Sequence, residues 1–298
     1  MRMVGQKITF GYAITVVFVG IFTIICLYPF LMVIAGSFES RAAAVLYGFS
    51  IIPRDFTTDA YKILFTNANN IVQAYKVTIG VTVTGTFLAL FVNSMMAFVV
   101  TRNNLPGAKV LNIYVLITML FSGGMVPWYI ICTQVLGLTD TYAALVLPMV
   151  ASAWNVFLIR NYFRSIPNEL YEAALVDGAG HFRIYWQIYI PAAKPIMATI
   201  LLFAALAYWN DWWHGLMLIN RTEMQPIQML LRALIANIQF IMQQGASATA
   251  EMQAILTNLP SDGVRMALVV VTTGPIILVY PFVQRYFVKG IMIGSVKG

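Results

Sequence analysis

The sequence predicts an all-α membrane protein with six transmembrane helices and with both termini in the cytoplasm. Three observations lead to this fold class: composition, six long apolar segments, and an uneven distribution of basic residues. Hydrophobic residues make up 60% of the 298 residues, only 10% are charged, and the mean hydropathy is +0.79. Such a chain has too few polar side chains to cover its apolar surface in water, so lipid has to cover it.

Each apolar segment is long enough to cross a bilayer, which requires roughly 20 residues of helix. The expected spans lie at about 8–38, 77–100, 108–126, 142–159, 195–219 and 264–283. The first is too long for the core of a signal peptide and is interpreted as an uncleaved span. In this topology the longer polar segments 39–76 and 221–262 are extracytoplasmic, and residues 230–242 within the second have helical periodicity that suits a helix lying on the membrane or capping a pore. We expect residues 1–298 to form a single transmembrane domain.

The net charge of +7 follows the expected topology. Eleven of the 18 Lys and Arg residues, but only three of the 11 acidic residues, fall in segments that this topology places in the cytoplasm. That distribution is the positive-inside bias of membrane proteins. The excess charge is therefore explained by membrane lipid, and it does not indicate a nucleic-acid partner.

Motifs for covalent chemistry are absent from the sequence. Cys26 and Cys132 lack CxxC spacing, and His181 and His214 are far apart, so neither pair predicts a metal site. There is no GxxxxGK[ST] motif and hence no P-loop for ATP. We predict that the chain is not an enzyme and carries no cofactor.

A polar island at 165–195 interrupts the apolar sequence and predicts a helix, a glycine turn and a second helix. Ser165 or Asn168 is expected to cap the first helix, because its side-chain oxygen can accept a free backbone N–H group. Gly178 is expected to end that helix, and a second helix over 181–189 then leads into a proline. We expect a compact, exposed connection between the fourth and fifth spans.

The spacing within this island matches a known signature. Its elements are Glu-Ala-Ala at 172–174, Gly178, Ile188, Ile190 and Pro191. The pattern resembles the cytoplasmic EAA signature of permease subunits of binding-protein-dependent ABC importers, although Ile190 stands where the family has Leu. The resemblance covers essentially the whole chain. The motif at 121–127 and the ending GIMIGSVKG further resemble one sugar branch, similar to the second permease of maltose-type systems, which includes importers of plant-wall and alginate oligosaccharides.

The resemblance implies the type I permease fold, with a cytoplasmic coupling helix that sits in a groove of an ATPase. The residues it assigns to this contact are Tyr171, Glu172, Ala173, Ala174, Asp177 and Gly178. Taken alone, Glu172 is equally compatible with a solvated helix charge, and Gly178 with an ordinary helix stop.

The resemblance also implies the assembly. The chain would pair with a second, non-identical permease, two ATPase subunits that carry ATP and Mg, and an extracytoplasmic sugar-binding protein, in the cytoplasmic (inner) membrane of a bacterium. It would form half of the pathway for an oligosaccharide, with acidic chains derived from alginate or pectin included.

Substrate contacts are expected in the fourth and fifth spans. Tyr208, Asp211 and Trp212 fall on one face if the fifth span is a continuous helix, and Asn155 lies in the fourth. Aromatic faces stack on sugar rings and a carboxylate accepts hydroxyl protons. The alternative is a belt of tryptophans at the membrane interface.

Four other functions remain open. An ABC permease for amino acids or peptides would share the signature. An ion-coupled secondary transporter would show inverted repeats and charged residues near midspan, which are not evident. A structural membrane subunit would need no EAA motif, and a membrane enzyme would need an acid–base or metal constellation.

Overall fold

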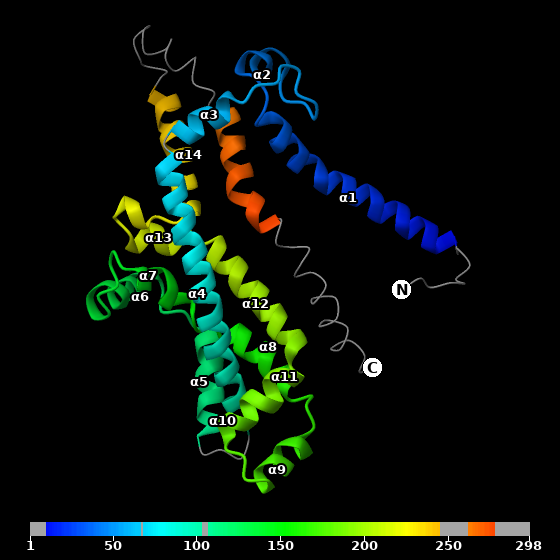
Figure 1. Ribbon diagram of the computed structural model, residues 1–298, viewed down its shortest axis with the longest axis vertical. Helices are drawn as coiled ribbons and strands as arrows, with labels where there is room; N and C mark the ends of the chain where they lie inside the picture. Colours follow the sequence, from blue (N-terminus) through cyan, green and yellow to red (C-terminus); the bar gives the residue numbers. More distant parts are fainter. Residues whose placement is uncertain (1–9, 67, 103–106, 245–261, 278–298) are drawn as a thin grey trace. The chain divides into compact units, whose positions relative to one another are not determined.

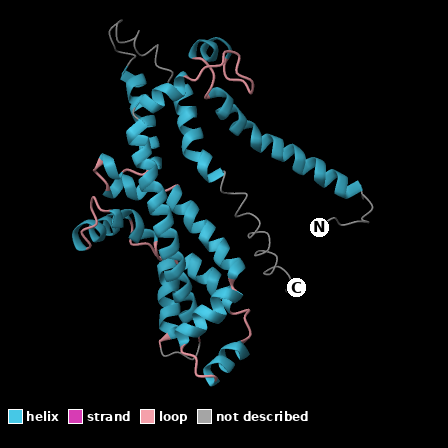
Figure 2. Cartoon of the chain, viewed as in Figure 1, coloured by secondary structure: helices cyan, strands magenta, loops and turns pink. Residues whose placement is uncertain are grey.

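The computed structural model describes residues 10–66, 68–102, 107–244 and 262–277, and within them the fold is helical, with one isolated β-bridge (Figures 1 and 2). The helices are α1 (Phe10–Gly36), α2 (Arg41–Tyr47), α3 (Asp59–Thr66), α4 (Ala68–Thr101), α5 (Ala108–Leu120), α6 (Met125–Ile130), η1 (Ile131–Val135), α7 (Tyr142–Val146), η2 (Leu147–Met149), α8 (Ala153–Phe163), α9 (Asn168–Val176), α10 (His181–Ile184), η3 (Tyr185–Tyr189), α11 (Ile190–Ala192), α12 (Lys194–Trp209), α13 (Trp213–Leu218), η4 (Thr222–Met224) and α14 (Ile227–Gln244). A further helix covers 262–277. The prediction of an all-α protein is confirmed for this part of the chain.

The chain divides into two compact units, and the expected single domain stays a prediction. One unit is Met1–Ala68 with Leu234–Gly274, and the other is Asn69–Ala233 with Pro275–Gly298. Among the described residues, two helices are long and apolar enough to cross a membrane alone, Gly11–Gly36 and Asn69–Thr101. Three bent helix pairs bring the number of candidate spans to as many as five.

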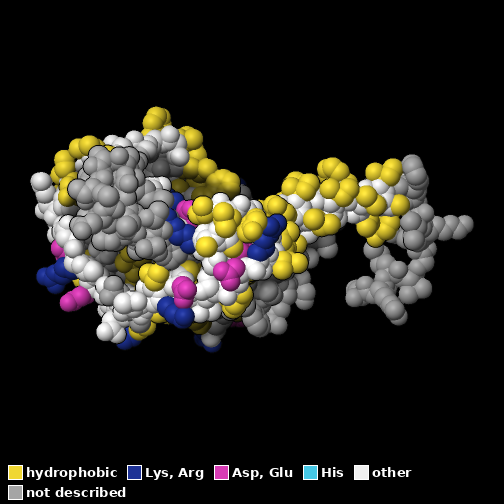
Figure 3. Space-filling view, turned by 90° about the horizontal axis from the view of Figure 1, so that it is seen from above, with side chains coloured by type: hydrophobic (Ala, Val, Ile, Leu, Met, Phe, Trp, Pro, Cys, Tyr) yellow, Lys and Arg dark blue, Asp and Glu magenta, His cyan; other side chains and the backbone are white. Residues whose placement is uncertain are grey.

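Helix α1 is apolar on all sides. None of its most hydrophobic window is buried within the chain, and large side chains such as Phe18, Phe22 and Ile24 are mostly exposed. Figure 3 shows many hydrophobic side chains exposed along this helix. An exposed surface of this kind requires lipid or another apolar partner, because moving so much apolar surface out of water is strongly favourable.

The segment after α1 folds around a buried carboxylate. Glu39 is 4% exposed and accepts hydrogen bonds from the backbone N–H groups of Arg54 (3.0 and 3.2 Å) and Asp55 (3.1 Å). Phe38 beside it stacks on Phe56 with ring centroids 5.2 Å apart. The carboxylate therefore holds the loop at 54–56 against the end of α1.

We expect Glu39→Ala to release this loop. The substitution removes the carboxylate that accepts from two backbone N–H groups, which costs about 2–3 kcal/mol in local stability. Hydrogen–deuterium exchange over residues 50–58 should accelerate by one to two orders of magnitude. The matched control is Asp59→Ala, which removes an exposed ion pair to Lys62 and should leave exchange in this segment nearly unchanged. Equal exchange in both variants would show that Glu39 does not hold the loop.

In the second unit, helix α4 carries two clusters of buried side chains. One cluster contains Phe98 of α4, Ile159 and Phe163 of α8, and Tyr189 of η3. The other lies further toward the start of α4 and includes Leu145 of α7. Helix α12 also contributes to both clusters, so α4 and α12 together connect the two halves of this unit's core (Figure 1).

The expected third and fourth spans are not continuous helices. Helices α5 and α6–η1 meet at 114°, and α7–η2 meets α8 at 48°. The third span bends between Leu120 and Met125, where Gly124 has φ +84°. In the fourth, Pro148 has no N–H group for a helical hydrogen bond, and the helix stops there. Buried Asn93 of α4 satisfies the freed backbone: its amide nitrogen donates to the carbonyl of Val150 (2.8 Å) and its oxygen accepts from the N–H of Ser152 (2.8 Å).

The expected fifth span, 195–219, is also broken, and the predicted shared face of Tyr208, Asp211 and Trp212 is therefore wrong. Helix α12 ends at Trp209 and α13 begins at Trp213. The Asp211 carboxylate accepts hydrogen bonds from the N–H groups of Trp213 (3.2 Å) and His214 (3.3 Å). A carboxylate at the start of a helix is favourable because it accepts from the free N–H groups there. Asp211 therefore favours a new helix at α13 over a continuation of α12.

Within the expected segment 221–262, the helix at 230–242 is confirmed as part of α14. The remainder of that segment at 245–261, the end of the sixth span beyond 277, the ending GIMIGSVKG and the N-terminal residues 1–9 lie outside the described residues.

Candidate functional site

The island at 165–195 forms the expected helix, turn and helix. Helix α9 is followed by α10, and the chain then continues through η3 into α11 with Pro191 near its start. The expected caps are wrong: residue Pro167 precedes α9, and no side chain caps it. The Ser165 hydroxyl donates instead to the carbonyl of Tyr162, and the Asn168 amide oxygen accepts from Arg102.

Gly178 ends α9 in a left-handed conformation with φ +76°. The N–H of Gly178 donates to the carbonyl of Leu175 (3.0 Å), and the N–H of Ala179 donates to that of Ala174 (2.9 Å). This pair of bonds is a Schellman cap, which requires a left-handed residue at the first position after the cap. A Cβ atom placed on Gly178 would meet nothing within 4 Å, so glycine is required by the backbone conformation and not by crowding.

Helix α9 has one inward and one outward face. Ala174 is buried and Tyr171 half-buried, whereas Glu172, Ala173 and Asp177 are exposed. The outward surface also carries large apolar side chains that the sequence analysis missed, namely Leu170, Leu175 and Val176, the last of which is 88% exposed. The sequence offered one sign of them: the apolar residues of this short helix are spread around its circumference, so one buried face cannot cover them all. We call the exposed residues of this helix the outward face of α9. It mixes apolar and acidic side chains, and nothing in the described chain covers it.

Arg102, just after α4, lies against the inward face of α9. Its guanidinium carbon is 3.8 Å from the ring centroid of Tyr171, 4.6 Å from that of Tyr189 and 5.2 Å from that of Phe98. Its Nη1 donates to the side-chain oxygen of Asn168 at 3.1 Å. Burial lowers the pKa of Arg102 from its ordinary value, but an arginine remains charged at neutral pH. We call these three rings the aromatic cage.

Two further contacts hold the island together and attach it to α4. The hydroxyl of Tyr171 shares a hydrogen bond with Nδ1 of His181 (2.9 Å), which joins α9 to α10. The hydroxyl of buried Tyr185 shares one with Ser94 of α4 (2.7 Å). Ile188 and Ile190 of the signature pack against the same core cluster. The island is therefore attached to α4, and the outward face of α9 has no cover within the described chain.

The four expected substrate residues lie in different local environments. Tyr208 is buried, and its hydroxyl donates to the carbonyl of Val146 at 2.9 Å, so it supports the fold. Asn155 lies in α8, half-buried, and its N–H donates to the hydroxyl of Ser152. Asp211 and Trp212 lie in the break between α12 and α13. The guanidinium carbon of Arg232 sits 3.5 Å from the Trp212 ring centroid.

A tryptophan cluster surrounds that break. Its members are Trp128, Asp211, Trp212, Trp213 and His214. His214 Nδ1 lies 2.9 Å from the Asp211 carboxylate, and the His214 and Trp128 rings meet edge to face at 5.3 Å. An open hollow of about 420 Å³ adjoins the cluster, with Ser122 and Gly124 on its other side. The sequence analysis missed Trp128, which reaches His214 only because the chain bends after α5.

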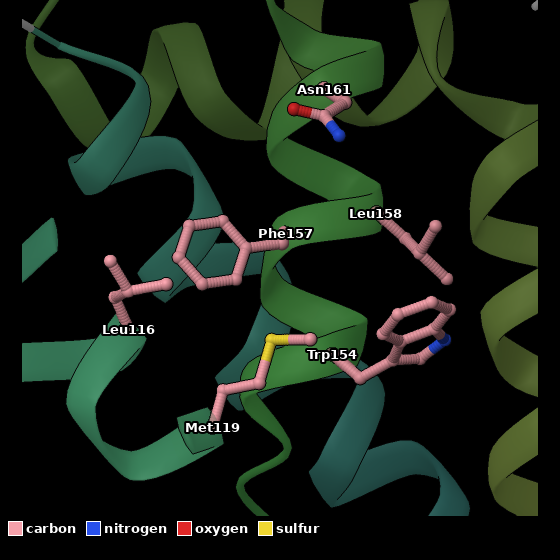
Figure 4. Close-up of a pocket in the computed structure, with 6 residues that line it drawn as sticks. All are labelled: Leu116, Met119, Trp154, Phe157, Leu158 and Asn161. Carbon is pink, nitrogen blue, oxygen red and sulfur yellow. The ribbon is translucent and has the colours of Figure 1, made fainter.

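A second hollow, of about 300 Å³, lies between α5 and α8 (Figure 4). Leu116 of α5 lies opposite Phe157 of α8, and Asn161 is the single polar side chain on its lining. It offers a hydroxylated ligand one amide group and little else. Among the described residues there is no group of three or more His, Cys, Asp and Glu side chains that could hold a metal ion.

Comparison with known proteins places this arrangement in a family. Residues 83–293 match the family model described as "Binding-protein-dependent transport system inner membrane component". The matched region contains α9, its glycine turn, the whole tryptophan cluster and the second half of α4. The chain belongs to this family and is a permease subunit rather than an enzyme.

Relatives match along nearly the whole chain. Protein LplC of Bacillus subtilis is 40% identical over 283 residues, which cover 95% of this chain and 93% of that protein. The polygalacturonan/rhamnogalacturonan transport system permease protein YtcP of the same organism is 38% identical over 94% of this chain and 96% of its own length. A crystal structure of a bacterial ABC transporter involved in the import of the acidic polysaccharide alginate contains a chain that is 30% identical, with a TM-score of 0.80, covering 96% of this chain and 100% of that one. The permease fold expected from the signature is confirmed.

Proposed function

We propose that this subunit forms half of the membrane pathway of an ABC importer for oligosaccharides, including acidic ones. The observation that carries the proposal is the outward face of α9, held out from the bundle by the Gly178 turn and uncovered within the described chain. In a family whose members depend on other subunits, an exposed apolar face on a rigidly attached helix is a docking surface.

The coupling site consists of Tyr171, Glu172, Ala173, Ala174, Asp177 and Gly178, supplemented by Leu170, Leu175 and Val176. Leu175 and Val176 bury apolar surface in the ATPase groove, small Ala173 allows close approach, and Glu172 and Asp177 supply polar contacts at the edge. Tyr171 and Ala174 face inward and transmit the displacement of α9 to the bundle. ATP and Mg are held by the partner subunits and not by this chain.

The assembly and its placement follow from the family. The subunit pairs with a second, non-identical permease, two ATPase subunits and an extracytoplasmic sugar-binding protein in the bacterial inner membrane. Six spans with both termini in the cytoplasm place α9 on the ATPase side and the segments 39–76 and 221–262 outside, in keeping with the basic residues on the cytoplasmic connections. ATPase closure beneath the two permeases alternates access to the pathway.

The tryptophan cluster is the place for sugar contact in this chain. Trp128, Trp212 and Trp213 offer ring faces and edges, while Asp211 and His214 offer polar atoms beside an open hollow. Arg232 on the Trp212 ring adds a positive charge that a neutral sugar does not need and a carboxylated one does. The names of the pectin-related relative and of the alginate importer point to the same substrate class.

Replacing Arg232 by Gln should lower uptake of an acidic oligosaccharide by roughly ten-fold, as expected for the loss of one partly exposed charge-assisted contact. Uptake of a neutral chain of the same length should stay unchanged. Arg232→Lys retains the charge and should fall between the two. Equal losses for acidic and neutral chains would show that Arg232 supports the fold and does not select the substrate.

The energy source separates the proposal from the ion-coupled alternative. In cells that carry the complete importer, uptake of labelled oligosaccharide should stop when ATP is depleted and should survive an ionophore that collapses ion gradients while ATP is maintained. Uptake that stops with the ionophore and persists without ATP would favour a secondary transporter. A panel of amino acids, peptides, neutral and acidic oligosaccharides in the same assay tests the substrate class.

A further inference from the structure

The aromatic cage around Arg102 contains a cation that the chain has placed almost wholly out of water. Arg102 is 7% exposed, and its Nε and Nη2 atoms have no hydrogen-bond partner among the described residues. The only hydrogen bond of its guanidinium given by the structure runs from Nη1 to Asn168. Burying a charged group with so few polar partners is unfavourable. The rings of Tyr171, Tyr189 and Phe98 provide the main compensation, because their electron-rich faces attract the guanidinium lying over them.

These contacts connect three separate parts of the fold. Phe98 belongs to α4, Tyr171 to α9 and Tyr189 to η3, and Arg102 itself follows the last turn of α4. Asn168, which accepts the hydrogen bond, is the first residue of α9. Helix α9 otherwise buries only Ala174. Arg102 therefore ties the end of α4 to both the start and the middle of α9, beside the ring contact of Phe98 with Tyr171.

We propose that Arg102 is a positioning residue for energy coupling: it clamps α9 to the end of α4. A displacement of α9 then moves α4 as well as α8, which precedes α9 in the chain, and α12, which follows α9 through α10, η3 and α11. This inference rests on the proposed role of α9 as the ATPase-docking helix and adds a second route into the bundle. Since α4 carries both core clusters, including Asn93 at the break before α8, motion of α4 reaches the tryptophan-cluster side of the unit.

The geometry demands arginine and not simply a positive charge. A planar guanidinium can lie against several rings while one edge donates to Asn168, whereas a lysine ammonium is a compact, strongly hydrated charge that cannot stack. A cation that only neutralised the carbonyl end of α4 would be replaced by lysine without loss. The two roles therefore differ in what Arg102→Lys does.

The test uses the complete complex with its second permease, ATPases and binding protein, reconstituted in liposomes. The measured quantity is the ratio of oligosaccharide imported to ATP hydrolysed. Arg102→Gln should lower this ratio by about ten-fold, and Arg102→Lys should lower it nearly as much, the size expected from a desolvated cation–π cluster. Lys109→Gln removes a positive charge from the same connection, but one that is exposed to solvent, and should leave the ratio unchanged. A normal ratio in Arg102→Lys would overturn the clamp.

A second measurement covers variants that assemble poorly. A spin label on Val176→Cys, in a background without Cys26 and Cys132, reports how firmly α9 is held. Label mobility should rise in Arg102→Gln and in Tyr171→Leu, and the double variant should be little more mobile than either one. Unchanged mobility in Arg102→Gln, or additive increases in the double variant, would overturn the inference. If the wild-type complex hydrolyses no ATP in response to loaded binding protein, the proposed function fails instead.

Discussion

Gly178→Asp is expected to abolish oligosaccharide uptake while the subunit still reaches the membrane. Gly178 sits at φ +76° with open space around it, and aspartate is one of the side chains that tolerate a left-handed backbone. The cost to the fold is therefore small, about 1 kcal/mol. The large effect comes from a new carboxylate at the end of α9, on the surface that the ATPase would cover, where an unpaired charge loses its water. The measurement is oligosaccharide uptake by the variant in a strain that lacks the native gene, divided by the amount of variant protein in the membrane.

Two neighbouring substitutions separate the causes of that loss. Gly178→Asn has nearly the same size and backbone tolerance without the charge, and it should retain part of the uptake. Gly180→Ala changes a glycine two residues away with an ordinary φ of −69° and should behave as wild type. Full uptake by Gly178→Asp would remove the coupling role of this turn.

Val176→Asp should detach the ATPase subunits from the permease. Val176 is 88% exposed and touches little within the chain, so the substitution leaves the subunit folded. In the assembly it places a carboxylate in a contact that otherwise buries a valine, and the loss of about 2–4 kcal/mol corresponds to a reduction in affinity of roughly 30-fold or more. The amount of ATPase that co-purifies with the tagged permease is the measurement.

Val45→Asp provides the matched control for this experiment. Val45 is also a largely exposed valine (74%), on α2, which the proposed topology places outside the cytoplasm. ATPase recovery with Val45→Asp should equal the wild-type value. If Val176→Asp retains the ATPases as well as Val45→Asp does, the outward face of α9 is not the docking surface.

Features of the fold that depend on local sequence could be predicted. Apolar length predicted the long helices α1 and α4, and the Glu-Ala-Ala motif with Gly178 predicted a helix that stops at that glycine. Periodicity over 230–242 predicted part of α14. Each of these rests on a pattern within one short stretch, which a sequence displays directly.

Features that depend on contacts between distant residues were missed or mispredicted. The break between α12 and α13 occurs because Asp211 accepts hydrogen bonds from the first N–H groups of a new helix. The sequence shows a carboxylate within an apolar segment, but it does not show which N–H groups that carboxylate binds. Arg102 reads as a polar turn residue until α4, α9 and η3 bring three rings around it. Trp128 meets His214 only after the bend that follows α5.

The central claim is that this chain transmits ATPase motion to an oligosaccharide pathway. The most direct test is ATP hydrolysis by the purified complex in liposomes, measured with empty binding protein and with binding protein loaded with acidic oligosaccharide. We expect two ATPase copies and one different permease to co-purify, with hydrolysis stimulated several-fold by the loaded protein and not in the Gly178→Asp complex. A chain that purifies alone or as a homo-oligomer, without ATPase and without sugar-stimulated hydrolysis, would contradict the account.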